Sequence, residues 1–175
     1  MKQKIVFATG NEDKMKEIRM ILSDLQIPVL SMKEAGLSAE IVEDGATFEE
    51  NAAIKARAVA QLTDAIVLAD DSGLEIDYLN GEPGVYSARY LGEDTPYEEK
   101  NKIILSRLQG VEGTARSARF VCSFAAAVPG AERQITRATV EGQIALEPAG
   151  DEGFGYDPIF YLPEFGCTTA QLTPE

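Results

Sequence analysis

Two adjacent carboxylates, Asp70 and Asp71, follow a hydrophobic run in the segment "VLADDSGLEID". Like charges repel, and burial strengthens the repulsion, so a positive group is expected beside them. With Mg²⁺ beside Asp71, one aspartate could hold the metal while the other orients it or activates water. The alternative is an Asp-rich turn in which Asp70 and Ser72 bond to local backbone. Because α/β sites form where strands end, the sequence favours a functional site.

A second candidate is the segment "FATGNEDK", which has the pattern of a strand, a tight turn and a helix. The backbone N–H groups at the start of a helix attract anions. Thr9 adds a hydroxyl, Asn11 an amide, and Lys14 lies one turn in, where it could point at a bound phosphate. The alternative is an ordinary Asn-capped helix with a solvated lysine. These residues alone favour the alternative, since the turn has too little glycine for a Walker loop.

A third candidate is the acid-rich segment "EIVEDGATFEENAAIKAR". Carboxylates can hold Mg²⁺, which takes a few of them together with water and substrate phosphate. The alternative is helix-start electrostatics, because acids stabilise a first turn. That alternative explains Glu49 and Glu50 better than it explains Glu43, which precedes the cap.

A fourth candidate is the segment "GDEGFGYDPIF" near the C-terminal end. Phe154 and Tyr156 flank Gly155, so the backbone can approach a flat ligand while an aromatic ring stacks on it. Asp157 could accept hydrogen bonds from that ligand. An aromatic-rich turn that leads into a strand at Ile159 and Phe160 explains the segment equally well.

Composition narrows the chemistry. The 175 residues suit one domain, and 29 acidic against 16 basic residues give a net charge of −13, which argues against binding a nucleic acid polymer. The absence of histidine removes Ser-His-Asp triads and most zinc sites. Two cysteines without an export signal favour a reducing cytoplasm, and no apolar run is long enough for a bilayer.

The hydrophobic periodicity predicts an α/β fold with a mixed sheet. Two Thr-x-x-Glu capping boxes, at Thr47–Glu50 and Thr95–Glu98, open predicted helices that run to about Leu62 and Gly110. Residues expected on helix faces are Met15, Ile18, Ile21, Leu22 and Leu25, then Ile54, Ala58 and Leu62. Short strands are expected at Lys4–Ala8, at "PVLSM", at Ile66–Ala69 and, after an Asp-Asp-Ser-Gly turn, at Leu74–Tyr78. A long strand is expected at 118–128, followed by an antiparallel strand at 133–145. The long strand should bury one face, which carries Ala118, Phe120, Cys122, Phe124, Ala126 and Val128.

Taken together, the motifs resemble the inosine triphosphate pyrophosphatase family, the HAM1-like enzymes that hydrolyse noncanonical purine nucleoside triphosphates. The resemblance runs from about Lys4 to the last residue. It is carried by "TGNEDKMKEI", "EDGATFEENAAIKARA", "LADDSGLEIDYLNGEPGVYSARY", "SARF" and "EPAGDEGFGYDPIF", which occur in this order. It implies a homodimer, an elongated mixed sheet flanked by helices, and two lobes around a central substrate cleft.

The resemblance also implies a reaction. Such enzymes use Mg²⁺ to split ITP, dITP and XTP between the α and β phosphates, which releases the monophosphate and pyrophosphate. Asp71 is the expected catalytic residue and, with Glu43, the expected metal ligand. The residues expected to bind substrate are Thr9, Gly10, Asn11, Lys14, Ser72, Phe154, Gly155, Tyr156 and Asp157, with Arg89 as a further candidate.

The sequence departs from the family pattern at one place. The pattern continues beyond "AQLTPE" into a lysine and a Ser-His-Arg motif, whereas this sequence ends at Glu175. The phosphate-splitting half of the site is therefore expected to be present, and the base-selecting half is expected to be incomplete. This leaves open a nucleotide-binding but catalytically impaired protein. A phospho-aspartate phosphatase fits less well, because Asp70 and Asp71 are adjacent rather than separated by one residue.

Overall fold

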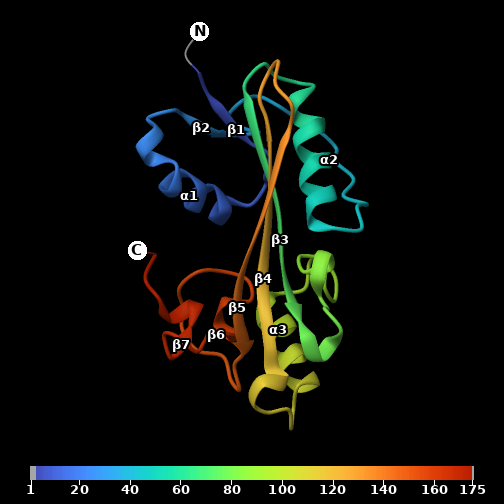
Figure 1. Cartoon of the computed structure of the whole chain (residues 1–175), viewed down its shortest axis with the longest axis vertical. Coiled ribbons are helices and arrows are strands. Elements are labelled where there is room, and N and C mark those ends of the chain that lie inside the picture. Colours follow the sequence, from blue (N-terminus) through green and yellow to red (C-terminus); the bar gives the residue numbers. More distant parts are fainter. Residues whose placement is uncertain (1–2, 175) are drawn as a thin grey trace. The chain divides into compact units, whose positions relative to one another are not determined.

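The computed structural model describes residues 3–174, so Glu175, where the sequence departs from the family pattern, lies outside the described residues. In this part of the chain, seven strands form one mixed sheet in the order β2-β1-β3-β4-β5-β6-β7 (Figure 1). The predicted α/β class is confirmed. None of the described helices combines the length and the apolar character that crossing a bilayer requires.

The elements follow the alternation expected from the sequence and end in short strands. The strands are β1 (Ile5–Phe7), β2 (Val29–Ser31), β3 (Ile66–Ile76), β4 (Ser117–Ala127), β5 (Gln134–Ile144), β6 (Phe160–Leu162) and β7 (Cys167–Thr168). The α-helices are α1 (Glu12–Ile21), α2 (Phe48–Ala60) and α3 (Tyr97–Arg107). The 3-10 helices are Ser23–Leu25, Asp77–Leu79, Gly84–Tyr86, Gly113–Arg116, Asp157–Ile159 and Thr169–Gln171.

The chain divides into two compact units, and the first contains the described residues up to Asp71 together with Cys122–Ala138. Here β1 pairs in parallel with both β2 and β3. The two faces of this sheet are covered by different helices, α1 on one and α2 on the other (Figure 1). The α1 face buries Phe7, Met15 and Ile18, and the α2 face buries Val6, Ala8, Ala52, Ala56, Val59, Val67, Ala69 and Ala125.

The second unit contains Ser72–Val121 and the described residues from Thr139 onward. Its core packs α3 against the second half of β3 and against the segment that leads into β6. In this unit β6 pairs antiparallel with the end of β5 and with β7. The buried core residues are Leu74, Ile76, Leu79, Ile104, Leu108, Ala118, Ile144, Tyr156, Ile159 and Phe160.

The largest departure from the sequence prediction is in β3. We predicted a turn at Asp70–Gly73 between two strands, but one strand runs without interruption from Ile66 to Ile76. The prediction was wrong because Asp, Ser and Gly are typical of turns, while tertiary pairing overrides that local preference. The twin carboxylates therefore lie in the middle of a strand, although they still come just after β1 ends opposite Leu68.

Helices α1 and α2 also differ from the prediction, both in where they end and in which side chains they bury. Helix α1 ends at Ile21, and both Ile21 and Leu25 are exposed. On α2 the buried face carries Ala52, Ala56 and Val59, whereas Leu62 lies beyond the helix and is exposed. Both errors have one cause, since an apolar residue at helical spacing stays exposed where no other element covers it.

The two predicted capping boxes have different outcomes. Thr47 caps α2 by accepting from the Glu50 amide at 3.1 Å, while the Glu50 carboxylate reaches back to the Ala46 amide at 2.6 Å. The cap of α3 is absent in the described structure, because the Thr95 hydroxyl donates to the Leu91 carbonyl at 2.6 Å instead.

The predicted long strand is present as β4, and Ala118 is buried as predicted, but from Val121 onward the more deeply buried face is the opposite one. From Val121 the fully buried side chains are Val121, Ser123 and Ala125, and the alternate set that includes Phe124 is half-buried. Both faces of this strand are covered in the first unit, so a period of two in the sequence cannot say which face is covered more completely.

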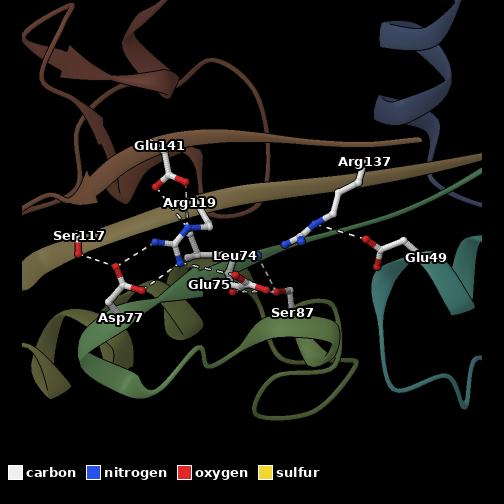
Figure 2. A network of polar contacts seen from close by, with 9 residues as sticks. All are labelled: Glu49, Leu74, Glu75, Asp77, Ser87, Ser117, Arg119, Arg137 and Glu141. Atoms are coloured by element: carbon white, nitrogen blue, oxygen red, sulfur yellow. Dashed lines mark hydrogen bonds and ion pairs between the residues drawn. The ribbon is translucent and has the colours of Figure 1, made fainter. Parts of the chain in front are cut away.

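A polar network in the second unit ties three consecutive strands of the sheet together (Figure 2). Arg119 on β4 bonds to both oxygens of Asp77 at 3.0 Å each and to Glu141 on β5 at 3.0 and 3.2 Å. Glu75 on β3 lies 3.6 Å from the same guanidinium. The hydrogen bonds from Arg119 lower the pKa of Asp77, and Asp77 and Glu141 in turn raise the pKa of Arg119. One cation therefore offsets three carboxylates.

We predict that Arg119→Met lowers the free energy of unfolding by about 1 kcal/mol, or roughly 2–4 °C in Tm, since the carboxylates are partly solvated. The lowered pKa of Asp77 stabilises the fold above its ordinary value of 3.8, and that stabilisation is lost as the pH falls through the folded-state pKa. The difference between parent and variant should thus be full at pH 7 and shrink below pH 3.8.

The matched control is Arg137→Met in the first unit, where the guanidinium faces one carboxylate, Glu49, at 3.5 Å (Figure 2). Its Tm should change less than that of Arg119→Met in a thermal melt at low salt. Equal losses for the two variants, or a loss independent of pH, would contradict a special role for the Arg119 network.

Candidate active site

The turn after β1 is held by its own polar side chains. The Asn11 side chain caps α1, because its Oδ1 accepts from the amides of Asp13 at 2.9 Å and Lys14 at 3.1 Å. The Thr9 hydroxyl accepts from the Asn11 amide at 3.1 Å. Beside Gly10 the space is open, since a Cβ there would meet no atom within 4 Å. The Asn-cap alternative is thus part of the structure, and the backbone at Gly10 stays accessible.

The adjacent carboxylates of β3 point to opposite faces of the sheet, because side chains alternate along a strand. Val67 and Ala69 pack on the α2 side, and Leu68 packs on the α1 side. By the same alternation Asp70 faces α1 and Asp71 faces α2. The expected repulsion between neighbours is therefore reduced by geometry, and each carboxylate meets a different set of partners.

Asp70 forms an ion pair with Lys14 of α1, with 2.7 Å between Lys14 Nζ and Asp70 Oδ2. Asp70 is only 3% exposed, so the pair is largely removed from water. Burial alone would lower the pKa of Lys14, but the charge and hydrogen bond of Asp70 outweigh that effect and raise it. We expected Lys14 to point at a phosphate, and in this structure its ammonium binds the strand carboxylate.

Asp71 is held from the α2 side. The Asn51 amide donates to Asp71 Oδ2 at 3.1 Å, and the Lys55 ammonium, 2.8 Å from Glu43, also attracts Asp71. Burial raises the pKa of Asp71, while Lys55 and the Asn51 bond work in the opposite direction and Glu43 adds to the rise. Two carboxylates, Glu43 and Asp71, therefore share the field of one ammonium.

The loop that carries Glu43 is docked on α2 through Gly45. The Gly45 amide donates to Asn51 Oδ1 at 2.8 Å, so both ends of this buried side chain are used. A Cβ at Gly45 would lie 2.6 Å from Asn51 Oδ1, so only glycine allows this approach. We singled out Glu43 and Asp71 from the sequence but gave no role to Asn51 or Lys55. The one signal in the sequence that points to them is their spacing of four residues, which places both on one face of a helix.

In the second unit, the turn at 153–157 is ordered by Asp157. Its Oδ2 accepts from the Phe154 amide at 2.9 Å, and its Oδ1 accepts from the Thr169 hydroxyl at 2.8 Å. A Cβ at Gly153 would lie 2.1 Å from Asp157 Oδ2, and the φ of Gly153 is +71°. The carboxylate that we expected to accept hydrogen bonds from a ligand therefore accepts bonds that hold the turn.

The same turn is anchored by Tyr156. Its hydroxyl donates to the Ser87 carbonyl at 2.6 Å, and its ring packs edge-on against Tyr97, with 5.1 Å between the ring centroids. Burial raises the pKa of Tyr156, so the phenol keeps its proton. Phe154 is half-buried.

The remaining candidates lie on β3 and the loop that follows it. Ser72 comes directly after Asp71 on β3 and is half-buried. Ser87 is buried, accepts from the Leu74 amide at 2.9 Å and donates to the Gly84 carbonyl at 2.6 Å. Arg89 is exposed and lies over the Tyr86 ring, 5.3 Å from its centroid. Arg89 is thus an exposed cation, stacked on Tyr86, on a loop that Ser87 fixes.

The described residues include no group of three or more His, Cys, Asp or Glu side chains that forms a metal cage by itself. Mg²⁺ does not require such a cage, since it binds through one or two carboxylates together with water and substrate phosphate. Glu43 and Asp71 are hard oxygen donors that already share a cation, so the donor set fits Mg²⁺.

Comparisons with known proteins agree with the resemblance seen in the sequence. The sequence model of the Ham1 family matches residues 5–175. A Bacillus subtilis (strain 168) protein named dITP/XTP pyrophosphatase is 49% identical over 175 residues, which are all of this chain and 88% of that protein. A Listeria innocua protein of the same name is 47% identical over 172 residues, 98% of this chain and 85% of that protein.

Solved structures agree in fold as well. The Staphylococcus aureus Ham1 protein superimposes with a TM-score of 0.85 at 42% identity, covering 98% of this chain and 87% of that one. A HAM1 protein from Coxiella burnetii gives a TM-score of 0.87, also at 42% identity, and covers 98% of this chain and 88% of that one.

The buried pair of α1 and β3 yields a stability prediction. Lys14→Met should lower the free energy of unfolding by about 3 kcal/mol, because Asp70 stays buried after its ammonium is removed. The double variant Lys14→Met with Asp70→Asn should regain at least half of that loss. Urea denaturation of the parent, of Lys14→Met, of Asp70→Asn and of the double variant measures this double-mutant cycle.

Lys16→Met is the control for this pair, because Lys16 is exposed on the same helix and reaches Asp13 at only 3.5 Å. It should leave the urea midpoint nearly unchanged. A Lys14→Met midpoint as high as that of Lys16→Met would show that the ion pair does not carry the expected stability.

Proposed function

The chain belongs to the Ham1 family, and on that premise we propose that it hydrolyses noncanonical purine nucleoside triphosphates. The substrates are ITP, dITP and XTP, and the products are the nucleoside monophosphate and pyrophosphate. The observation that carries the proposal is 49% identity over all 175 residues with a protein named dITP/XTP pyrophosphatase. The carboxylates and cations gathered at the carboxyl end of β1 support it.

Thr9, Gly10, Asn11 and Lys14 bind the triphosphate in this proposal. The open space at Gly10 supports a close approach of phosphate to backbone, and the start of α1 attracts negative charge. Lys14 offers a point charge for phosphate oxygens. Its bond to Asp70 fixes the ammonium at the edge of this turn before substrate arrives.

Glu43 and Asp71 would hold Mg²⁺, which when bound neutralises phosphate charge. The two carboxylates already tolerate a shared cation, Lys55, and this supports their assignment as ligands. Asn51 fixes the orientation of Asp71, because its own amide oxygen is tied to the Gly45 amide. Lys55 then restrains Glu43, so neither carboxylate has to be ordered at the moment of binding.

Asp71 also serves as the base for the attacking water. The water oxygen forms a bond to the α phosphorus, the bond from that phosphorus to the bridging oxygen breaks, and pyrophosphate leaves with the bridging oxygen. The water proton passes to Asp71. A carboxylate whose pKa is raised by burial accepts a proton more readily than a fully solvated one.

The purine side of the substrate is assigned to Ser72, Arg89 and the turn Phe154–Asp157. Phe154, which is half-buried, supplies an aromatic ring for stacking, and Gly155 lets the backbone approach a flat base. Tyr156 and Asp157 contribute by fixing that turn, as their internal bonds support. Arg89 supplies a cation on an anchored loop.

The setting of the enzyme belongs to the same proposal. Residues 1–175 act as one nucleoside-triphosphate pyrophosphatase domain that works as a homodimer in the cytoplasm. Its partners are nucleotides and a second copy, rather than nucleic acid polymers or membranes, in keeping with the net charge of −13.

A panel of ITP, dITP, XTP, GTP and ATP with Mg²⁺ tests the function, with pyrophosphate and phosphate measured separately. We expect pyrophosphate as the product, preferentially from ITP, dITP and XTP, and loss of turnover with excess chelator. Phosphate released without pyrophosphate would reject the proposed bond cleavage. Tight binding of ITP without turnover would support the catalytically impaired alternative.

We predict that Asp71→Asn lowers kcat at least about 100-fold, which corresponds to roughly 2.7 kcal/mol in the barrier. The variant loses both a metal ligand and the proton acceptor, but keeps the shape of the side chain. Asp64→Asn, an exposed aspartate before β3, should be as active as the parent. An Asp71→Asn enzyme that keeps a tenth of the parent kcat would exclude Asp71 as the base.

A further inference from the structure

Three buried donors in the second unit each bind a backbone carbonyl of a loop. The Lys100 ammonium donates to Ala88 O at 2.7 Å, the Asn101 amide to Gly155 O at 3.3 Å, and the Tyr156 hydroxyl to Ser87 O at 2.6 Å. All three side chains are at most 5% exposed. These bonds link α3, the loop 84–92 and the turn 153–157 into a closed circuit.

Two consecutive residues of α3 supply two of these bonds, and they reach different loops. Neighbours on a helix point about 100° apart, so Lys100 and Asn101 serve two directions from one turn. Lys100 binds the loop that carries Arg89, and Asn101 binds the turn that carries Phe154. Tyr156 joins the loop and the turn directly, so neither can shift without affecting the other.

Burying Asn101 costs free energy, and only the hydrogen bond that its side-chain NH₂ donates accounts for its presence. Its Oδ1 is buried and has no hydrogen-bond partner among the described residues. A leucine of similar size would avoid that cost, since an unpaired buried acceptor is unfavourable. The amide therefore has value as the donor to Gly155 O. Gly155 has a φ of +65°, a conformation that glycine adopts readily, and the Tyr97 ring lies in van der Waals range of it, 3.6 Å from where a Cβ would be.

Lys100 follows the same logic. Its side chain is 1% exposed, and burial lowers the pKa of its ammonium. The ammonium lies 4.6 Å from the centroid of the Tyr97 ring while it donates to Ala88 O. Ser87, which precedes Ala88 in the chain, is held at two atoms: its carbonyl accepts from the Tyr156 hydroxyl and its hydroxyl accepts from the Leu74 amide. With Ser87 and Ala88 O held inward, Tyr86 and Arg89 stay at the surface.

We propose that Lys100 and Asn101 are positioning residues that clamp the Arg89 loop and the Phe154 turn in one register for purine binding. The inference rests on the proposed function, because it takes the Phe154 turn as the base-binding element. Neither residue touches substrate. Both act through the backbone carbonyls that they hold, so their loss should weaken the contact with the base and spare the triphosphate.

The test uses Lys100→Met and Asn101→Leu in the full chain, with Lys102→Met as the control. The Lys102 ammonium forms ion pairs with Glu98 and Glu99 on the exposed face of α3. Steady-state kinetics with ITP gives KM and kcat separately, and inhibition by tripolyphosphate, which has no base, reports the phosphate side alone. Calorimetric binding of ITP and hydrogen exchange of 84–89 and 153–157 provide readouts without turnover.

For each clamp variant we expect KM for ITP to rise about tenfold with kcat within about threefold of the parent. Inhibition by tripolyphosphate should be unchanged. Amide hydrogen exchange should speed up more at 84–89 than at 153–157 in Lys100→Met. In Asn101→Leu it should speed up more at 153–157 than at 84–89. The control should match the parent in every measurement.

Two results would overturn the clamp. One is an unchanged KM with a lower kcat per mole of total protein and a lower Tm, because that pattern describes a partly unfolded enzyme. The other is an equal loss of affinity for ITP and tripolyphosphate. A parent that binds ITP without hydrolysing it would reject the proposed function, while ITP binding by the variants would still decide the clamp.

Discussion

Side-chain alternation along β3 is the constraint on which the first unit depends. Asp70 and Asp71 are neighbours in the chain, yet the strand sends one carboxylate to the α1 face and the other to the α2 face. Each face must then supply its own compensation. Lys14 supplies it on one side, and Asn51 with Lys55 supplies it on the other. A turn at this point would have left both carboxylates exposed to water, where neither would need a partner from a helix.

This constraint explains why the helices carry polar residues where they meet the sheet. Asn51 is 1% exposed on an otherwise apolar face of α2, and it is satisfied at both ends, by the Gly45 amide and by Asp71. Buried polar groups are tolerated when every partner is present. The glycine loop, the helix and the strand therefore form one polar unit, and Glu43 is attached to it through Lys55.

The sequence predicts the elements well and the side-chain partners poorly. The strands at Ile5–Phe7 and Val29–Ser31 and the Thr47 cap of α2 depend on local patterns, so they could be predicted. The uninterrupted β3 could not, because Asp-Asp-Ser-Gly has turn chemistry and only pairing with other strands keeps it extended. For the same reason the ion pair of Lys14 with Asp70 was missed, since it joins residues 56 positions apart.

The motifs of the second unit show a different limit. The sequence predicts Asp157 and Tyr156 as ligand-binding groups, and that stays a prediction; in the structure their polar atoms hold the turn and the neighbouring loop. A hydrogen bond to a backbone carbonyl leaves no trace in the sequence of the residue that accepts it. The residues that shape a binding surface through its backbone, such as Lys100 and Asn101, can therefore be found only once the three-dimensional contacts are known. In such a site the residues that touch the ligand and the residues that determine its geometry are different sets, and a motif identifies them together without separating them.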